Sequence, residues 1–342
     1  MNLLFFFISH INILQKSNIL LNFVLKYINN MSEKVKNILV LGANGLLGTM
    51  FRENISHDYK DNNWVFCVRT EESKKNEYDI VFDCAKKTKH HWEELLQGQN
   101  IVINCTAATK VDAIESDIES ACASHEINFR AMEILSEVCK EKDITLIHFS
   151  TDYVFNGEST RPYCEFDCCN PINRYGEDKY RGELAIRNSG CKYLIFRTSW
   201  VYSHNPGNFF TNMLDKIDKG TALFYGVSDI ISSPTYADDL AKAVINIIVT
   251  NQEHKIGVYH YTNEGVCTRY DFMQAVKNLN EREDNYCEIE PVPNSFFNCP
   301  TRRPAYSVMS KTLVQNVFKI GIPHWMDSLK RCYDKYKTQN NL

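Results

Sequence analysis

Short apolar runs alternate with longer, mostly polar stretches between residue 31 and about residue 200. Residues 37–41 form the first such run, and their apolar positions are continuous, which indicates a strand buried on both faces. The pattern returns at residues 65–68, 79–82, 100–104, 144–149 and 193–196. Residues 115–140 and 175–187 carry apolar side chains at helical spacing. This order predicts an α/β fold with a doubly wound parallel sheet that has helices on both faces.

The alternation loosens beyond about residue 200. We expect helices at residues 238–249 and 270–279, a strand at 257–261 and a terminal helix at 324–337. A proline-punctuated stretch between residues 291 and 304 suits loops better than helices. The sequence therefore predicts a nucleotide-binding domain over residues 31–200 and a smaller substrate-binding lobe over residues 201–342, with some of its strands and helices returning to the main sheet.

The first thirty residues differ in character from the remainder. Their apolar runs are interrupted by polar residues, so they do not provide the roughly 20 apolar residues of a membrane span. A basic start and a small-residue cleavage site, which a signal peptide requires, are not evident. We interpret residues 1–30 as a leader that the folded protein does not need. A targeting or membrane-surface segment is the alternative.

Composition narrows the class of protein. The 342 residues are 44% hydrophobic and 23% charged, which is ordinary for a globular chain and excludes general disorder. The 38 basic and 42 acidic residues give a net charge of −4 without a basic stripe, which argues against nucleic-acid binding. Thirteen cysteines occur without a C-x-x-C pair, so we expect a reduced, cytoplasmic compartment, no membrane partner and no metal site.

A glycine-rich turn follows directly on the first apolar run. Gly42, Gly45 and Gly48 have the spacing G-x-x-G-x-x-G. In a Rossmann-type sheet the first glycine makes the tight turn, the second admits a pyrophosphate, and the third lets the helix pack on the strand. Backbone amides at the helix start then face the phosphates. The expected dinucleotide-binding residues here are Gly42, Asn44, Gly45, Leu46, Leu47 and Gly48.

Roughly twenty residues later, such a fold places the group that reads the adenosine ribose. Arg69 occupies this position where NAD-binding proteins carry an acid, and an arginine suits the 2′-phosphate of NADP. Lys74 and Lys75 add positive charge. We therefore expect NADPH as the cofactor, with NADH as the alternative. Asp83 and Cys84, after the third strand, fall where the adenine would lie.

Two further patterns predict chemistry. Ser150 and Thr151 end the strand at 144–149, and Tyr175 and Lys179 form Y-x-x-x-K on an expected helix. Residues four apart share a helix face, and a nearby cation lowers the pKa of a phenol. Tyr175 would then donate a proton near neutral pH, while a hydroxyl from Thr151 or Ser150 would hold a substrate carbonyl.

Together these motifs resemble the extended short-chain dehydrogenase/reductases, and within them the dTDP-4-dehydrorhamnose reductase family. The resemblance covers about residues 37–330. The segments that carry it are the glycine turn, residues 106–109 with 111–112, residues 148–155, 171–173, 182–183, 196–202, 207–209, 233–235 and 303–304. The most discriminating is the run from Phe196 through Arg197, Thr198, Ser199 and Trp200 to Tyr202.

This resemblance implies an NAD(P)H-dependent oxidoreductase that reduces the C4 ketone of a nucleotide-linked 4-keto-6-deoxyhexose. Tyr175 would be the proton donor, Lys179 would bind the nicotinamide ribose, and Thr151 would polarise the carbonyl. Residues implied to line the cofactor are Ala107, Ala108, Thr109 and Phe149. Those implied to meet the substrate are Val111, Thr151, Asp152, Tyr153, Trp200 and Arg303.

Some questions stay open at this level. Certain bacterial members bind magnesium at a dimer interface through a glutamate just after the glycine turn, where this chain has Met50, so that metal and that mode of dimer are in doubt. A homodimer of another kind is compatible with the sequence. One alternative function is a catalytically silent subunit like the regulatory β subunit of methionine adenosyltransferase, and another is a nucleotide-sugar epimerase. Whether the nucleotide is dTDP or UDP is also undetermined.

Overall fold

The computed structural model describes residues 35–58, 62–85, 87–280 and 287–341. The chain divides into two units, residues 1–36 and residues 37–342, and the second contains every element discussed below. The expected leader at residues 1–30 lies outside the described residues. None of the helices in the described ranges is long and apolar enough to cross a membrane.

A parallel sheet forms the centre of the larger unit. Within the described residues it has seven strands in the order β10-β6-β5-β4-β1-β2-β3, and every neighbouring pair is parallel. The strands are β1 (Asn37–Leu41), β2 (Asn63–Val68), β3 (Ile80–Val81), β4 (Ile101–Asn104), β5 (Thr145–Thr151), β6 (Lys192–Thr198) and β10 (Gly257–His260). This is the Rossmann strand order with one added strand, and it confirms the predicted fold class.

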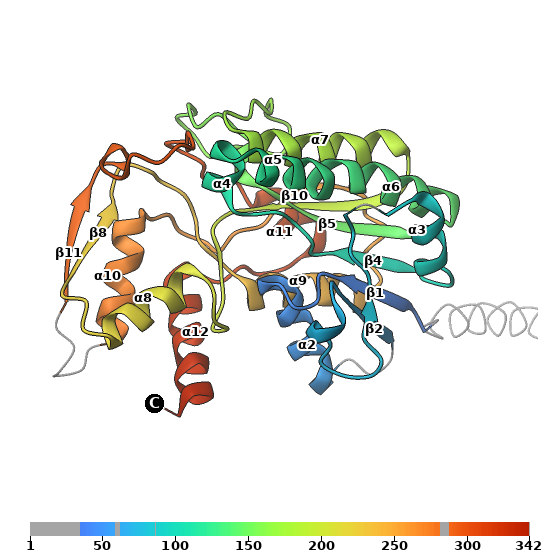
Figure 1. The fold of residues 1–342 in the computed structure, drawn as a ribbon, viewed down its shortest axis with the longest axis horizontal. Helices are drawn as coiled ribbons and strands as arrows, with labels where there is room; N and C mark the ends of the chain where they lie inside the picture. Colours follow the sequence, from blue (N-terminus) through green and yellow to red (C-terminus); the bar gives the residue numbers. More distant parts are fainter. Residues whose placement is uncertain (1–34, 59–61, 86, 281–286, 342) are drawn as a thin grey trace, which may run out of the picture. The chain divides into compact units, whose positions relative to one another are not determined.

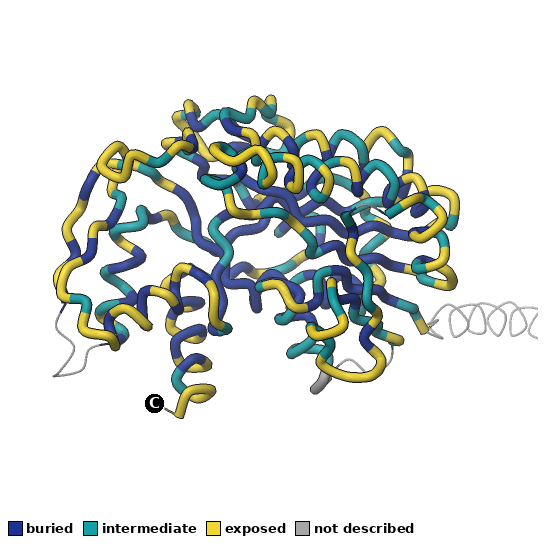
Figure 2. Tube along the Cα trace, viewed as in Figure 1, coloured by how far each residue is buried: buried dark blue, intermediate teal, exposed yellow. Residues whose placement is uncertain are grey.

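Helices cover both faces of this sheet (Figure 1). One layer contains α3 (Lys89–Leu95), α6 (Ala131–Glu141) and α7 (Arg174–Ser189). The opposite layer contains α2 (Leu46–Asp58), α9 (Ala237–Val249) and α11 (Thr312–Phe318). The central strands between them are mostly buried, as Figure 2 shows, because helices cover both faces of the sheet. Burial on both faces of the sheet explains why the apolar runs in the sequence are continuous.

Residues 115–140, whose spacing predicts helical structure, do not form one continuous helix. The structure instead has α4 (Val111–Ser116), α5 (Ile118–Ser124), a π-helical turn η2 (His125–Arg130) and then α6. Asp117 separates the first two because it is extended and its side chain accepts a hydrogen bond from the amide of Ser120 at 2.7 Å. The π-helical turn then places Asn128 in a buried position, where it contacts the cleft loop described below.

A smaller lobe lies beside the carboxyl end of the sheet (Figure 1). It contains a parallel pair of strands, β8 (Leu223–Val227) and β11 (Glu288–Val292), with α8 (Phe209–Asp218), α10 (Arg269–Leu279) and α12 (Trp325–Asn340). Its core is largely aromatic and includes Tyr202, Phe210, Phe272 and Trp325. β10, α9 and α11 come from beyond residue 201 and return to the main sheet.

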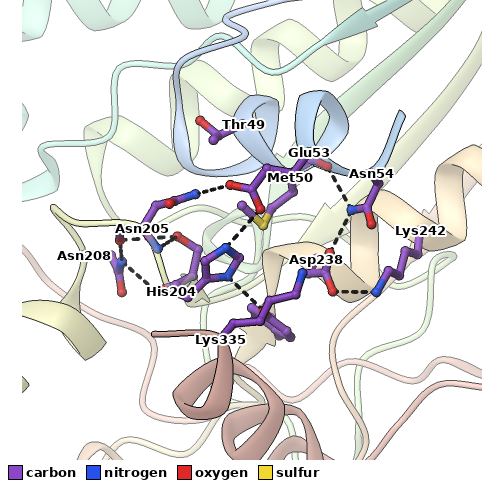
Figure 3. A network of polar contacts seen from close by, with 12 residues as sticks. Thr49, Met50, Glu53, Asn54, His204, Asn205, Asn208, Asp238, Lys242 and Lys335 are labelled. Carbon is purple, nitrogen blue, oxygen red and sulfur yellow. Dashed lines mark hydrogen bonds and ion pairs between the residues drawn. The ribbon is translucent and has the colours of Figure 1, made fainter. Parts of the chain in front are cut away.

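Polar contacts join α2 to the lobe. His204 Nε2 lies 3.0 Å from Glu53 Oε2, and His204 Nδ1 lies 2.9 Å from the hydroxyl of Tyr236, which belongs to β9 (Thr235–Tyr236) (Figure 3). The Asn205 amide donates to Glu53 Oε1 at 2.7 Å. Met50, one turn before Glu53 on α2, is fully buried. Because α2 begins at the glycine turn, this network joins the lobe to the element that follows that turn.

Candidate active site

A cleft of about 540 Å³ opens where β5 ends and the lobe begins. The carboxyl end of a doubly wound sheet is where such folds bind ligands. Both the expected proton donor and all six expected substrate-binding residues line this one cleft. These residues are Val111, Thr151, Asp152, Tyr153, Tyr175, Trp200 and Arg303, and Leu46 and Thr109 from the cofactor set line it as well.

The glycine turn connects β1 to α2 with little room for side chains. Gly42 has a φ of 70°, which favours glycine. A Cβ on Gly48 would lie 2.2 Å from the carbonyl oxygen of Gly42, so α2 packs directly on the turn. A Cβ on Gly45 would meet only the Gly42 carbonyl, at 3.3 Å, which leaves the backbone open to a ligand. The amides of the first turn of α2 have no partner within the helix, so this turn fits a pyrophosphate.

The loop after β4 contains Ala107, Ala108 and Thr109, which were expected to line the cofactor. Asn128 holds it from the π-helical turn, because its side chain accepts from the amide of Ala108 and donates to the carbonyl of Ala108, both at 3.0 Å. Ala107 and Thr109 on either side are exposed. Asn128 was not predicted as a site residue, because no local motif marks it.

Arg69, the residue expected to read the adenosine ribose, lies at the end of β2 with Lys74 five residues later. Arg69 directly follows β2 and is exposed, so its guanidinium is available to a phosphate. Lys74 does not add to its field as predicted, because its ammonium forms an ion pair with Glu71 at 3.0 Å. Asp83 is exposed after β3, and Cys84 is buried.

Tyr175 and Lys179 lie on α7, whose first turn is capped by the side chain of Asn173. Lys179 is buried, and its Nζ donates to the carbonyl of Phe149 at 2.7 Å and lies 3.1 Å from His148 Nε2. Burial lowers the pKa of Lys179 to about 8. His148 was not predicted as a site residue, although it begins the segment 148–155 that carries the family resemblance.

The pKa of Tyr175 differs from the expectation. Burial raises it above the ordinary value for tyrosine, and a hydrogen bond with Thr151 offsets part of that effect. The predicted lowering by Lys179 is wrong for this arrangement, since the ammonium is committed to Phe149 and His148. Tyr175 therefore holds its proton at neutral pH, as a donor must. The ring of Tyr153 lies edge-on at 5.9 Å.

Thr151 ends β5 and connects to the short helix η3 (Asp152–Val154). Its hydroxyl donates to Asp152 Oδ1 at 3.1 Å and accepts from the amide of Tyr153 at 3.2 Å. Burial raises the pKa of Asp152 to about 6, although a hydrogen bond with Ser307 opposes this. Phe149 contributes its backbone carbonyl rather than its ring, because the ring packs against Phe51 and Phe196 in the core.

The lobe supplies the opposite wall. Trp200 has a φ of 51°, a strained conformation for a large side chain that directs it away from the line of β6. The guanidinium of Arg269 lies 3.7 Å from the centre of its ring. Arg303 donates to both carboxylate oxygens of Asp112, at 2.7 and 2.8 Å. Arg269 was not predicted as a site residue, since the expected helix began one residue later, at Tyr270.

The described residues contain no group of three or more His, Cys, Asp or Glu side chains that could hold a metal ion. The features that define the site are instead a glycine turn after β1, a Thr-ended β5 and Y-x-x-x-K on α7. On a Rossmann sheet these define the class of short-chain dehydrogenase/reductase-type oxidoreductases.

Comparison with known proteins identifies the family within this class. The model of the RmlD substrate binding domain matches residues 36–338. The chain belongs to this family, that of the dTDP-4-dehydrorhamnose reductases, and is an NAD(P)H oxidoreductase of that kind.

Three relatives illustrate the similarity. The dTDP-4-dehydrorhamnose reductase of Burkholderia thailandensis is 33% identical over 244 residues, which cover 68% of this chain and 80% of the relative. The spore coat polysaccharide biosynthesis protein SpsK of Bacillus subtilis is 37% identical over 233 residues, covering 68% and 77%. The crystal structure of the dTDP-4-dehydrorhamnose reductase from Bacillus anthracis in complex with NADP superposes with a TM-score of 0.76 at 26% identity, covering 88% of this chain and 100% of that one.

Proposed function

We propose that this protein uses NADPH to reduce the C4 ketone of a nucleotide-linked 4-keto-6-deoxyhexose, such as dTDP-4-dehydro-L-rhamnose or a UDP equivalent. The observation that carries the proposal is the convergence of Thr151, Tyr175 and Trp200 on one cleft that begins at the glycine turn. A ketone in this cleft would meet two hydroxyls from the sheet side and an aromatic face from the lobe.

The chain's own residues supply the proton and the orientation. Tyr175 donates its phenolic proton to the carbonyl oxygen as the ketone becomes an alcohol. The Thr151 hydroxyl, which donates to Asp152 Oδ1 in the structure, would rotate to donate a second hydrogen bond to that oxygen. NADPH, when bound, supplies the hydride that C4 receives. Lys179 lies one helical turn from Tyr175, and its ammonium, which donates to the carbonyl of Phe149 and lies beside His148, would bind the nicotinamide ribose. Asp152 and Tyr153 flank the sugar.

The cofactor assignment follows the sheet side of the cleft. The turn from Gly42 to Gly48 and the first amides of α2 would hold the pyrophosphate. Arg69 would bind the 2′-phosphate, which is the reason we propose NADPH over NADH. Support for this choice comes from the exposed position of Arg69 and from the Bacillus anthracis relative, whose structure is a complex with NADP.

We also place the enzyme in the cytoplasm, as an enzyme that could form a homodimer. The support for a reducing compartment is that all thirteen cysteines are free thiols. Size-exclusion chromatography with light scattering would measure the oligomeric state directly.

The decisive experiment is a turnover assay on a panel of substrates. The purified protein is mixed with NADPH and, in separate reactions, dTDP-linked and UDP-linked 4-keto-6-deoxyhexoses, and the loss of NADPH absorbance is followed. A product with a C4 hydroxyl, identified by NMR, is the expected result. NADPH binding without turnover of any ketone would instead indicate a silent regulatory subunit, and tightly retained NAD with no net oxidation would indicate an epimerase.

A further inference from the structure

A line of buried polar side chains runs behind the cleft, from β4 through β5 to α7. Asn104 and His148 are register partners on the two neighbouring strands, and Lys179 follows on α7. The Asn104 amide nitrogen lies 3.1 Å from His148 Nδ1, and His148 Nε2 lies 3.1 Å from Lys179 Nζ. All three residues are at most 1% exposed. Asn104 and His148 are not among the described residues that line the cleft, so they would act on a ligand through Lys179.

The orientation of the Asn104 amide is determined by the loop after β4. Its Oδ1 accepts from the backbone amide of Thr106 at 3.0 Å and from the Thr106 hydroxyl at 2.6 Å. A backbone N–H can only donate, so the atom that it meets must be the oxygen and not the nitrogen of the side-chain amide. The Asn104 NH2 group therefore faces His148, and it also lies 3.0 Å from Met132 Sδ.

This orientation determines which ring nitrogen of His148 carries the hydrogen. Burial and the charge of Lys179 lower the pKa of His148 well below its ordinary value, so the ring is neutral at physiological pH. A neutral imidazole has one N–H and one acceptor nitrogen. Because the Asn104 NH2 group donates to Nδ1, the hydrogen lies on Nε2, and Nε2 faces Lys179. The ring therefore presents a hydrogen-bond donor to the lysine.

A donor beside Lys179 acts differently on the two protonation states of this side chain. The ammonium has three N–H groups and no lone pair. One of them donates to the carbonyl of Phe149 at 2.7 Å, while the Nε2–H of His148 meets the ammonium as a second donor. The neutral amine keeps the bond to Phe149 and has a lone pair that accepts from His148. The amine therefore uses both neighbours as hydrogen-bond partners, whereas the ammonium uses one.

The other titratable groups near Lys179 leave this effect in place. Glu183 raises the pKa of Lys179 through space, but its carboxylate is already paired with Arg197 at 2.7 Å. Tyr175, one helical turn earlier, holds its proton because burial raises its pKa. Burial lowers the pKa of Lys179 to about 8, so the ammonium is the main form at neutral pH and the amine the main form above that value. His148 is thus placed beside a group that titrates close to physiological pH.

We propose that Asn104 and His148 are positioning residues that set the proton equilibrium of Lys179, because Asn104 holds the His148 tautomer whose Nε2–H donates to the lysine amine. This inference rests on the proposed function, in which Lys179 binds the nicotinamide ribose. Deprotonation breaks one N–H bond of the ammonium and passes the proton to water, and nothing is oxidised or reduced. Both charge states of the lysine keep one position, since the amine gains the hydrogen bond that the ammonium lacks.

The tautomer can be measured directly by NMR on the full-length protein with 15N-labelled histidine. Two-bond 1H–15N correlations distinguish a ring with its hydrogen on Nε2 from one with its hydrogen on Nδ1, and His148→Gln assigns the signal. We expect the Nε2–H form in the wild type at neutral pH. In Asn104→Asp an oxygen replaces the NH2 group, so we expect the hydrogen to move to Nδ1. An Nδ1–H ring or an imidazolium in the wild type would overturn the proposal.

The consequence for Lys179 is measured through NADPH binding. The Kd for NADPH is determined by fluorescence titration at a series of pH values above neutrality. We expect the wild type to bind more weakly as the ammonium is lost, since a charged donor makes the stronger hydrogen bond to a ribose hydroxyl. In Asn104→Asp the lone pair of Nε2 accepts from the ammonium and a carboxylate lies nearby, so the midpoint should move up by about one pH unit or more. Lys179→Met should show no midpoint in this range, which assigns the titration to Lys179.

Asn280→Asp is the matched control. It introduces the same carboxylate at another buried position, in the lobe, where Asn280 Oδ1 accepts from the Tyr333 hydroxyl at 2.9 Å. We expect it to lower the Tm as Asn104→Asp does, but to leave the His148 tautomer and the pH midpoint unchanged. The wild-type spectrum decides the tautomer even where Asn104→Asp does not fold.

Two results in Asn104→Asp would contradict the proposal. A hydrogen that moves to Nδ1 without any change of the midpoint would show that the His148 tautomer has no effect on Lys179. A midpoint that moves while the tautomer stays the same would show an effect of the added charge alone, and would remove His148 from the argument.

Neither measurement needs a ketone, so this proposal and the proposed function fail separately. The expected tautomer and midpoint in a protein that reduces no ketone would keep the role of Asn104 and His148 and remove the reaction. Turnover of a 4-keto sugar nucleotide by a wild type whose His148 carries its hydrogen on Nδ1 would keep the reaction and remove that role.

Discussion

The two walls of the cleft treat buried charge in opposite ways. On the sheet wall, Lys179 has its ammonium held by Phe149 and His148, and the protein itself completes the group. On the lobe wall, Arg269 is held by aromatic faces and has an unused donor. A cation that already has hydrogen-bond partners in the protein keeps its position with or without a ligand. A cation with an unused donor gains a hydrogen bond when a ligand binds. We therefore expect changes on the sheet wall to affect chemistry and cofactor, and changes on the lobe wall to affect the sugar nucleotide.

Tyr175→Phe is the largest expected effect on the sheet wall. It removes the proposed proton donor and leaves the ring in place, and general acid catalysis typically contributes about 10²–10⁴-fold. We expect kcat to fall by that factor, with the Kd for NADPH and the Tm nearly unchanged. Steady-state kinetics measure kcat, fluorescence titration measures the Kd for NADPH, and thermal unfolding measures the Tm. Wild-type turnover in this variant would remove Tyr175 from the mechanism.

Asp152→Asn tests the protonation state of the Asp152 carboxyl group, which lies in the cleft between the two walls. The pKa of Asp152 is raised by burial from 3.8 to about 6, so between these values the folded protein binds more protons than the unfolded chain. Its contribution to stability therefore falls as pH rises from about 4 to 6, by on the order of 2–3 kcal/mol. Urea unfolding at several pH values should show the wild type losing stability relative to Asp152→Asn across this window. Parallel curves would mean that Asp152 ionises normally.

Trp200→Ala tests the lobe wall. The indole stacks on Arg269 and also packs 5.3 Å from Phe272. Aromatic contacts of this kind contribute about 0.5–1.5 kcal/mol beyond burial, so we expect the KM for the sugar nucleotide to rise roughly tenfold, with NADPH binding retained. Trp200→Phe, which keeps an aromatic face, serves as the control. A fall in stability of about 3–5 kcal/mol with an unchanged KM would identify Trp200 as a core residue only.

Arg69→Asp concerns the cofactor alone. Hydrogen bonds to charged groups contribute about 1.5–3 kcal/mol, so loss of the arginine should raise the KM for NADPH about tenfold or more. The KM for NADH should stay level or fall, because an acid can pair with a ribose hydroxyl. Kinetics with each cofactor at saturating ketone give the ratio. If the ratio does not move, Arg69 is a surface residue without a role in cofactor choice.

Local sequence patterns predicted the sheet side well, since each feature there depends on neighbours in the chain. Residues 37–48 contain a buried strand and a glycine turn whose conformation follows from local sterics. The Y-x-x-x-K pair shares a face because a helix repeats about every four residues. The break in the helix expected at 115–140 was missed, because the π-helical turn that buries Asn128 is stabilised by its contacts with the loop after β4.

What the sequence by itself determined is thus the α/β fold, the glycine turn after the first strand and the placement of Tyr175 and Lys179 on one helix, all of which rest on short-range spacing. Only the tertiary structure decided that His148 and Phe149 would hold Lys179, and that burial would raise rather than lower the pKa of Tyr175. It also decided that Arg269 would lie over Trp200, 69 positions earlier in the sequence, with no counter-ion among the described residues. Desolvation and long-range contacts depend on which groups surround a residue in three dimensions. The spacing of residues along the chain does not specify those surroundings.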